Sequence, residues 1–247
     1  WYTVDLHEEF PDNPIIVSSI ETYDGSDTAG LRIRNLGPSS FQVLIEEEQS
    51  GDVEIGHTTE RVAYFAVEAG AITDSAGSVI GEAGGIVREQ VDRSQWHTVN
   101  LAGIYQNPVV MMNIVTYAGQ QPAHLRLRNV GMSSFQFQVE EWLYLDAYHV
   151  DEQIHYVVLE SGIHELSSHR SVEVGTIQAD HNFTDVWFAA DFNDPVILSH
   201  SQTYNGWHAI TTRQTDGGPS GFSIKVEEEE GNDGSHVFEE IGYIAIE

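Results

Sequence analysis

One residue pattern occurs three times along this chain of 247 residues. In each occurrence an Arg precedes a Phe by nine residues, and the Phe leads into a cluster of glutamates. A His then precedes a Glu by three residues, and a Tyr follows that Glu by four. The three sets are Arg32, Phe41, His57, Glu60 and Tyr64; Arg126, Phe135, His149, Glu152 and Tyr156; and Arg213, Phe222, His236, Glu239 and Tyr243. Matching at fixed spacing predicts three copies of one module of about 85 to 95 residues.

Within each copy, apolar and polar residues alternate over short stretches. Leu31 and Ile33 alternate with Arg32 and Arg34, and turn-forming residues separate such stretches. A period of two residues is typical of antiparallel β-strands, and no stretch has a convincing helical period. The sequence therefore predicts an all-β chain of three tandem, antiparallel, six-stranded β-sandwich modules.

The predicted modules cover residues 1–70, 71–162 and 163–247. A Gly- and Ala-rich segment follows Ala69, and we interpret it as the opening strand of the second copy. This interpretation rests on Ile86, which precedes Trp96 by the same distance that separates Ile177 from Trp187. The first copy begins at its own Trp and lacks this strand, so we expect a piece of a longer array whose missing strand comes from preceding sequence.

Charge and composition exclude several classes of function. The 39 acidic residues outnumber the ten Lys and Arg and give a formal net charge of -29. Binding to nucleic acid or to an anionic membrane needs a basic face, so neither is expected. Mutual repulsion of the acidic groups is screened at high salt, which fits a salt-loving or marine source, and the surface could also collect Ca²⁺. The chain has no cysteine, which excludes disulfides and thiolate chemistry.

The order of motifs in each copy resembles the H-type lectin domain, a family that includes snail agglutinins and the C-terminal domain of discoidins. The shared order is a strand that follows a Pro, a Thr with a turn, the Arg and Phe, an outward aromatic, and a final strand with Tyr four residues before Glu. The resemblance implies six-stranded β-sandwiches that form threefold trimers and bind galactose or N-acetylgalactosamine near subunit junctions. Three copies in one chain then suggest an intramolecular pseudo-threefold trimer, and a string of separate modules is the alternative.

The resemblance also implies sugar-binding positions. Its Arg carries over to Arg32, Arg126 and Arg213. Its Trp carries over only to Trp142, because Glu48 and Glu229 stand at the matching positions in the other copies. The His that follows this Trp in the family is replaced by Leu143, so the family's polar partner is missing.

Strand alternation by itself places Trp142 on the outside of its sandwich, close to Tyr144 and Tyr148. An aromatic plane beside the outward Arg126 suits a sugar, because C–H groups pack on the ring while hydroxyls bind the guanidinium. The alternative is that Trp142 fills an interface between copies, where aromatic residues and Arg are also enriched. Trp207, next to His208, is a second candidate for sugar binding, or else packs within its loop.

The remaining repeated groups are acids and histidines. His and Glu three residues apart could form a hydrogen-bonded structural pair or bind Ca²⁺ or a transition metal, although positions three apart on a strand face opposite sides. The candidates are His57, Glu60, His149, Glu152, His236 and Glu239. Paired carboxylates can hydrolyse glycosides, but these recur in every copy, whereas catalytic sites are single, so we expect no enzyme.

The sequence therefore predicts a non-catalytic carbohydrate-binding protein at the cell surface or outside the cell. It would be part of a larger secreted protein or an adhesin and would bind glycans or polysaccharide, with Ca²⁺ as the one cofactor considered. The alternative is a structural repeat unit of an extracellular filament, surface layer or fibre. Such a unit would self-assemble with neighbouring repeats or chains through its acidic faces in a salt- or Ca²⁺-dependent manner.

Overall fold

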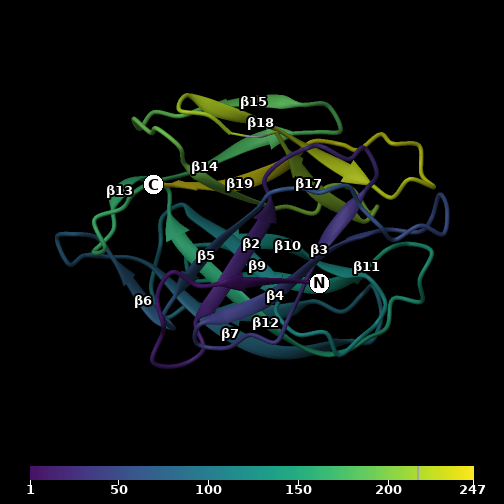
Figure 1. The fold of residues 1–247 in the computed structure, drawn as a ribbon, viewed down its shortest axis with the longest axis horizontal. Coiled ribbons are helices and arrows are strands. Elements are labelled where there is room, and N and C mark those ends of the chain that lie inside the picture. Colours follow the sequence, from purple (N-terminus) through teal and green to yellow (C-terminus); the bar gives the residue numbers. More distant parts are fainter. Residues whose placement is uncertain (216) are drawn as a thin grey trace.

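The computed structural model describes residues 1–215 and 217–247, which form nineteen β-strands and no helix (Figure 1). The all-β prediction is therefore confirmed. None of these residues belongs to a helix that could cross a membrane. We call residues 1–70, 71–162 and 163–247 repeats 1, 2 and 3, and a strand that begins one residue before such a boundary is counted with the repeat that contains the rest of it.

The strands recur in the same order in each repeat. Repeat 1 contains β1 (Tyr2–Asp5), β2 (Ile15–Ile20), β3 (Ala29–Arg34), β4 (Ser40–Glu47) and β5 (Val62–Val67). Repeat 2 contains β6 (Gly70–Thr73), β7 (Val79–Gln90), β8 (His97–Asn100), β9 (Pro108–Ile114), β10 (Ala123–Gly131), β11 (Ser134–Glu141) and β12 (His149–Glu160). Repeat 3 contains β13 (Gly162–Glu165), β14 (Ser171–Ala179), β15 (Thr184–Trp187), β16 (Val196–Ser201), β17 (Ile210–Gln214), β18 (Gly221–Glu228) and β19 (Glu239–Ile246).

Each repeat has two antiparallel sheets. One sheet has three strands, in the orders β1-β4-β3, β8-β11-β10 and β15-β18-β17. The other sheet has four strands in repeats 2 and 3, in the orders β6-β7-β12-β9 and β13-β14-β19-β16. In repeat 1 the corresponding sheet contains only β2 and β5. Repeat 1 therefore has no counterpart of β7 or β14 among the described residues.

The short strands β6 and β13 were not predicted. Each forms a hairpin with the following strand, so repeats 2 and 3 have seven strands rather than the six expected. The two hairpins bond to each other through the N–H of Ser75 to the carbonyl of Glu165, at 2.7 Å, and through the N–H of Ser167 to the carbonyl of Thr73, at 3.0 Å. They lie together on the left in Figure 1.

The repeated Phe fixes the interior of each sandwich. Phe41, Phe135 and Phe222 are buried and stand opposite Val4, Val99 and Val186 on the first strand of the three-stranded sheet. The core of repeat 2 shows the packing, since it contains side chains from β8 through β12 and thus from both sheets. Alternating inward and outward residues produce this arrangement, as in other β-sandwiches.

The register corrects one sequence match. Trp96 lies three residues before Val99, and the residue three before Val186 is Phe183 rather than Trp187. Trp187 lies just after the inward Val186 and is 73% exposed. The pairing of Trp187 with Trp96 was wrong because the inward valine, and not the aromatic residue, determines the strand register.

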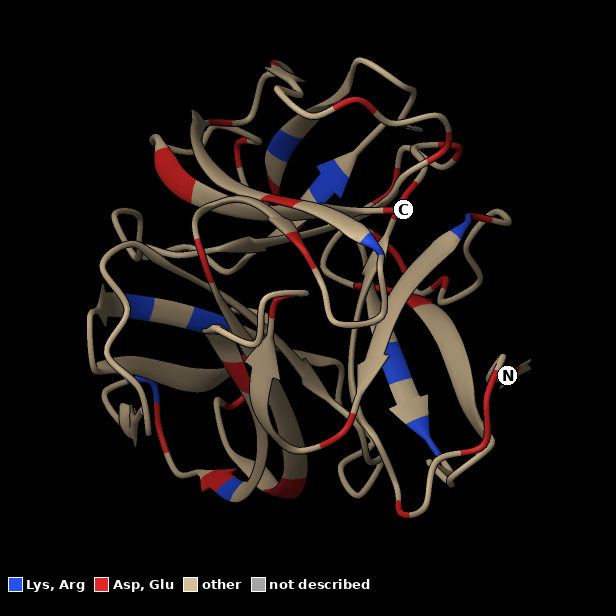
Figure 2. Ribbon diagram, turned by 90° about the vertical axis from the view of Figure 1, so that its left-hand side faces the viewer, with Lys and Arg blue, Asp and Glu red and all other residues tan. Residues whose placement is uncertain are grey.

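The three repeats pack against one another as three lobes around a common centre (Figure 2). One apolar cluster contains buried residues of all three, including Val17 of repeat 1, Met111 of repeat 2 and Leu198 of repeat 3. Val115 of repeat 2 also packs into the core of repeat 1. The alternative of modules strung along a flexible chain therefore does not describe this structure.

Candidate functional site

Each repeat contains a buried carboxylate that caps the turn after β2, β9 or β16. Glu152 accepts hydrogen bonds from the N–H groups of Ala118 and Gly119, at 2.9 and 2.8 Å, and from the hydroxyl of Thr116. Glu60 and Glu239 occupy the same position in the other repeats, where their partners are Thr22, Asp24 and Gly25, and Thr203, Asn205 and Gly206. The capped turn is thus the same local structure three times.

A buried His joins this carboxylate to a second one. The Nδ1 atom of His149 lies 2.9 Å from Glu141, and its Nε2 atom lies 3.3 Å from Glu152. His57 bridges Glu47 and Glu60 in the same way, and His236 bridges Glu228 and Glu239. The facing glycine is required in each turn, because a Cβ on Gly119 would lie only 2.6 Å from the His149 ring.

Strand alternation predicts that the side chains of a His and a Glu three residues apart point to opposite sides. That prediction was wrong. A register irregularity between His149 and Glu152 turns both side chains toward the same turn. The geometry at His57, Glu60, His149, Glu152, His236 and Glu239 is that of hydrogen-bonded pairs. Among the described residues no group of three or more His, Cys, Asp or Glu is arranged to hold a metal ion. Metal binding at these positions stays a prediction. A cation would have to displace the hydrogen-bond donors that already contact the carboxylates.

These contacts shift the pKa values of the buried groups. Burial alone would raise the pKa of Glu152, but hydrogen bonds from His149, Gly119 and Thr116 outweigh it and lower the pKa to about 2. Glu239 behaves alike, with a pKa of about 2, because His236, Thr203 and Arg126 favour its charged form despite burial. Burial would lower the pKa of His149, yet its bonds to Glu141 and Glu152 raise the pKa.

The repeated Arg crosses from each repeat into the capped turn of the next. Arg32 of repeat 1 donates to the carbonyls of Gly119 and Gln121 in repeat 2, at 2.7 and 3.0 Å, and pairs with its own Glu46 at 2.8 Å. Arg126 of repeat 2 donates to the carbonyl of His208 in repeat 3, at 2.9 Å, and pairs with Glu239 at 3.1 Å.

Arg213 closes the cycle from repeat 3 back to repeat 1. It donates to the carbonyls of Gly25 and Asp27, both at 2.8 Å, and pairs with Glu60 at 3.2 Å. A tyrosine of the receiving turn covers each guanidinium, at 4.4 to 4.7 Å from the ring centroid; the three tyrosines are Tyr117 over Arg32, Tyr204 over Arg126 and Tyr23 over Arg213. We call these three sets of contacts the arginine clamps.

Sequence reasoning correctly directed these arginines out of their own sandwiches but assigned them to sugar binding, with an interface between copies as the alternative. All three are buried, Arg126 and Arg213 completely. The tyrosines that cover them were missed, although Thr-Tyr recurs as Thr22-Tyr23, Thr116-Tyr117 and Thr203-Tyr204 at the spacing of the other repeated residues. Because their side chains are buried, the arginines cannot contact a sugar from solution.

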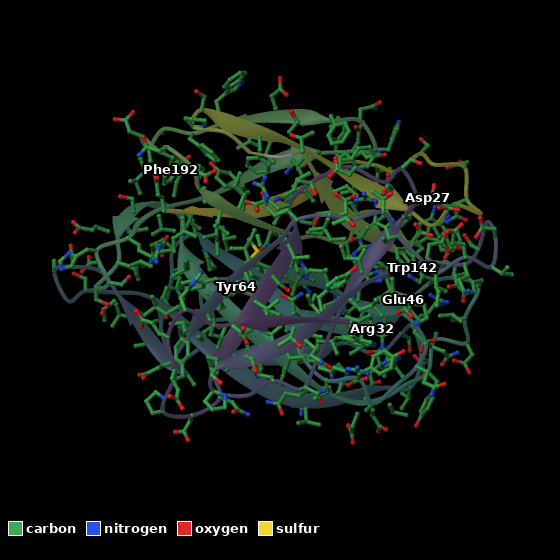
Figure 3. All side chains as sticks on the ribbon, viewed as in Figure 1. Asp27, Arg32, Glu46, Tyr64, Trp142 and Phe192 are labelled. Atoms are coloured by element: carbon green, nitrogen blue, oxygen red, sulfur yellow. The ribbon has the colours of Figure 1, made fainter. Side chains whose placement is uncertain are left out.

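Trp142 was also expected on the surface, and it is only 2% exposed. Its ring packs against His124, at 4.6 Å between centroids, and His124 bonds at 2.9 Å to Glu140 beside Arg126. The prediction of an exposed aromatic platform at Trp142 was therefore wrong. The alternative of an interface between copies describes this residue, because the neighbouring repeats close over that face. Figure 3 shows Trp142 at the same end of the molecule as Asp27 and Glu46.

The three strand ends around Trp142 bind one another. The N–H of Leu143 in repeat 2 donates to Glu229 of repeat 3 at 2.6 Å, and the N–H of Glu230 donates to Glu48 of repeat 1 at 2.6 Å. The N–H of Gln49 donates to the hydroxyl of Tyr144 at 3.0 Å, so Tyr144 joins repeats 1 and 2 while remaining 39% exposed. Tyr148 and Trp207 are exposed too, and Trp207 lies on the surface beside His208.

A second cycle of contacts caps strand edges at the centre. The N–H of Val110 on β9 donates to Gln202 of repeat 3, at 2.9 Å, and the N–H of Ile197 on β16 donates to Glu21 of repeat 1, at 2.8 Å. The matching N–H of Ile16 on β2 donates to Nδ1 of His155 in repeat 2, at 3.0 Å. Burial lowers the pKa of His155 to about 4, which keeps that nitrogen free to accept.

Sequence reasoning could not find these edge caps, because their residue types do not repeat. Glu21 and Gln202 match Val115 in repeat 2, whose side chain cannot accept a hydrogen bond. His155, on the neighbouring strand of the same repeat, supplies the acceptor instead.

The centre of the molecule also holds a small polar cavity of about 90 Å³. Ser18, Asn113 and His200 line it, one from each repeat. A cavity of this size admits a few water molecules but not a sugar ring, since ligand pockets are typically about 300 to 1,000 Å³. The buried polar groups at the centre therefore leave no room for a sugar among them.

No family model matches the chain, and no solved structure matches it. The chain is similar to a protein named Halomucin from Haloquadratum walsbyi, with 31% identity over 254 residues. The aligned region covers 94% of this chain but 3% of Halomucin. The chain thus spans a small fraction of the length of the relative that it matches.

Arg126→Ala should lower the free energy of unfolding by about 3–5 kcal/mol, because it leaves Glu239 buried without its cationic partner. The matched control Arg88→Ala removes an exposed arginine whose hydrogen bond is to the carbonyl of Val87, and should change stability by less than about 0.5 kcal/mol. Urea unfolding at constant high salt measures both. Equal losses in the two variants would contradict the role of the clamp.

Stability should also depend on pH with opposite signs at the two ends of the range. Glu152 and Glu239 have folded-state pKa values of about 2, below the ordinary 4.5, so their contribution is complete above pH 4.5 and is lost as the pH falls toward 2. His149 has a folded-state pKa above the ordinary 6.5, so its contribution is complete below pH 6.5 and is lost as the pH rises through that folded-state pKa.

Urea midpoints measured across this pH range at fixed salt check both signs. His149→Gln should remove part of the loss on the alkaline side, whereas His7→Gln, at an exposed position, should not. A stability that increases between pH 6.5 and 9 would contradict the assignment for His149.

Proposed function

We propose that this chain is a non-catalytic structural repeat unit of a large extracellular or cell-surface protein. The observation that carries the proposal is the closed cycle of arginine clamps. Each clamp buries a guanidinium against backbone carbonyl oxygen and a tyrosine of the next repeat, and in two of the three clamps also against a carboxylate there, so the repeats hold one another in fixed positions. Residues that would otherwise recognise a ligand are thereby committed to making one compact body.

The similarity to Halomucin supports the same role. It extends over almost the whole of this chain and over a small part of a far longer protein. A compact unit that accounts for so little of its relative is what a protein built from many units would contain. We therefore extend the proposal to a larger secreted parent protein for this chain.

The distribution of charge adds support for a salt-rich environment. Figure 2 shows Asp and Glu on the loops of all three lobes, while Lys and Arg lie mainly on strands. With a net charge of -29, repulsion between the lobes opposes the compact state at low ionic strength and is screened as salt is added.

Calorimetry tests this function directly. The chain should unfold in one cooperative transition, since the repeats share a core and the clamps close a cycle. The midpoint should rise between about 0.1 and 2 M NaCl because salt screens the acidic repulsion. Three separate transitions, or a midpoint that falls over this range of salt, would contradict a single structural unit.

Carbohydrate binding is the second candidate, and one observation favours it at a surface position. The ring of Trp207 is 67% exposed and lies 4.1 Å from that of His208, which offers an aromatic face with a polar neighbour. Under this proposal the ligand is a galactose-type glycan or a polysaccharide, bound at Trp207 rather than at the buried Trp142.

A glycan array with and without Ca²⁺ at high salt separates the two candidates. Carbohydrate binding predicts a signal that Trp207→Ala abolishes and that the matched control Trp187→Ala, also at an exposed tryptophan, leaves unchanged. Absence of binding under every condition, or equal loss in both variants, would remove this candidate and leave the structural unit.

A further inference from the structure

The edge of β5 that faces away from β2 differs from the strand edges that face the centre of the molecule. The edges of β2, β9 and β16 that face the centre are capped by side chains of another repeat, namely His155, Gln202 and Glu21. On its other side β2 pairs with β5. Within residues 1–215 and 217–247, no strand or side chain bonds to the backbone of Val62–Val67 on the side away from β2.

The other two repeats show what covers this edge. In repeat 2 the matching strand β12 lies between β9 and β7, and in repeat 3 the matching strand β19 lies between β16 and β14. There Val157 and Ile244 are fully buried, whereas Phe65 at the same position of β5 is only partly buried. An apolar edge strand with no charge or proline between its ends is a template for pairing with another strand.

A tyrosine on β5 indicates which residue a strand that pairs with β5 needs. Tyr156 and Tyr243 each stand opposite a glycine, Gly84 on β7 and Gly175 on β14. The tyrosine lies across that glycine so closely that a Cβ there would be 2.5 or 2.6 Å from the hydroxyl oxygen and almost as close to the ring. Tyr64 occupies the same position on β5 and has no strand on this side. The partner of β5 therefore needs a glycine opposite Tyr64.

A glutamate two residues before this glycine, on β7 and on β14, gives a second requirement for the partner of β5. Glu173 on β14 accepts hydrogen bonds from the N–H groups of Ala189 and Ala190, at 2.8 and 2.7 Å. Glu82 on β7 accepts from Ala102 and Gly103 in the same way.

The matching N–H groups in repeat 1 are those of His7 and Glu8. Leu6, which precedes them, bonds to Ser39 just as Phe188 bonds to Ser220. In the part of the chain that the structure describes, these two N–H groups have no acceptor. A glutamate on the strand beside β5 would supply it.

We propose that the free edge of β5 takes up an antiparallel strand from a further repeat of the same type, with the Glu-x-Gly pattern of β7 and β14. In this register the glycine lies opposite Tyr64 and the glutamate opposite Ala66, where it caps the N–H groups of His7 and Glu8. The hairpin that precedes such a strand would join the hairpins β6–β7 and β13–β14, which already bond to each other. The inference goes beyond the proposed function and rests on it only in taking the donor to be another repeat.

A peptide with the sequence of Ser171–Ala179 tests the proposal on the intact chain. We expect saturable binding by fluorescence anisotropy, together with slower amide hydrogen exchange at Val62–Val67. The matched peptide with Gly175→Val should bind about tenfold more weakly or worse, because its side chain collides with the Tyr64 ring. The Glu173→Gln peptide should also bind more weakly, since a neutral amide is a poorer acceptor for the two N–H groups.

A fusion removes the entropic cost of binding a separate peptide. Residues 171–182 placed directly before Trp1 reproduce the connection of repeat 3, in which Phe183 holds the position of Trp1. The thermal midpoint should rise by about 5 °C, and the same fusion with Gly175→Val should show no such rise.

Two results would overturn the proposal. The first is a peptide and fusion that leave both the exchange at Val62–Val67 and the thermal midpoint unchanged. The second is a dimer of the chain joined through β5, which would assign the edge to a second copy instead. Neither result would alter the single unfolding transition expected of the structural unit, so failure of this proposal is distinguishable from failure of the proposed function.

Discussion

A guanidinium removed from water needs partners for its charge, and three such groups determine how this chain is assembled. Arg32, Arg126 and Arg213 each pair with a glutamate of their own repeat and complete their contacts in the next repeat. There carbonyls accept from the terminal nitrogens and a tyrosine covers the plane. A repeat standing alone would keep the glutamate but lose the carbonyls and the tyrosine, and a buried charge that loses partners is costly. Packing between repeats therefore stabilises the buried arginine of each one.

The carboxylates in the turns that the arginines enter are prepared by the local chain. Backbone N–H groups, a threonine hydroxyl and a histidine favour the ionised form of Glu152 and Glu239, and Arg126 adds to this at Glu239. Each turn thus carries a negative charge where the Arg of the neighbouring repeat enters it. This preparation explains why the motif of Thr, Gly, His and Glu recurs with the Arg at fixed spacing, although the two halves of each contact lie in different repeats.

Much of the fold could be predicted from the sequence, because a period of two residues and a triple repeat are strong local signals. For Trp142 the sequence left two alternatives, a surface platform and an interface, since alternation shows that a side chain leaves its own sandwich but not what stands outside it. The same limit applies to Arg126, whose outward direction was correct and whose surroundings were not. His149 and Glu152 converge through an irregular register that regular alternation does not contain. The edge caps could not be predicted because the matching positions Glu21, Val115 and Gln202 do not hold the same residue type.

The residue at this position varies together with the residue at a second position of the same repeat, the one that holds His155 in repeat 2. Where the long acceptors Glu21 and Gln202 are present, the position that corresponds to His155 holds the small residues Ala63 and Gly242. The space is shared, because a Cβ on Gly242 would lie 2.8 Å from the Gln202 amide. In repeat 2 the arrangement is reversed, with Val115 beside His155. The two positions are therefore epistatic: exchanging one alone either crowds the centre or leaves a buried N–H without an acceptor, and only a double exchange moves a repeat from one solution to the other.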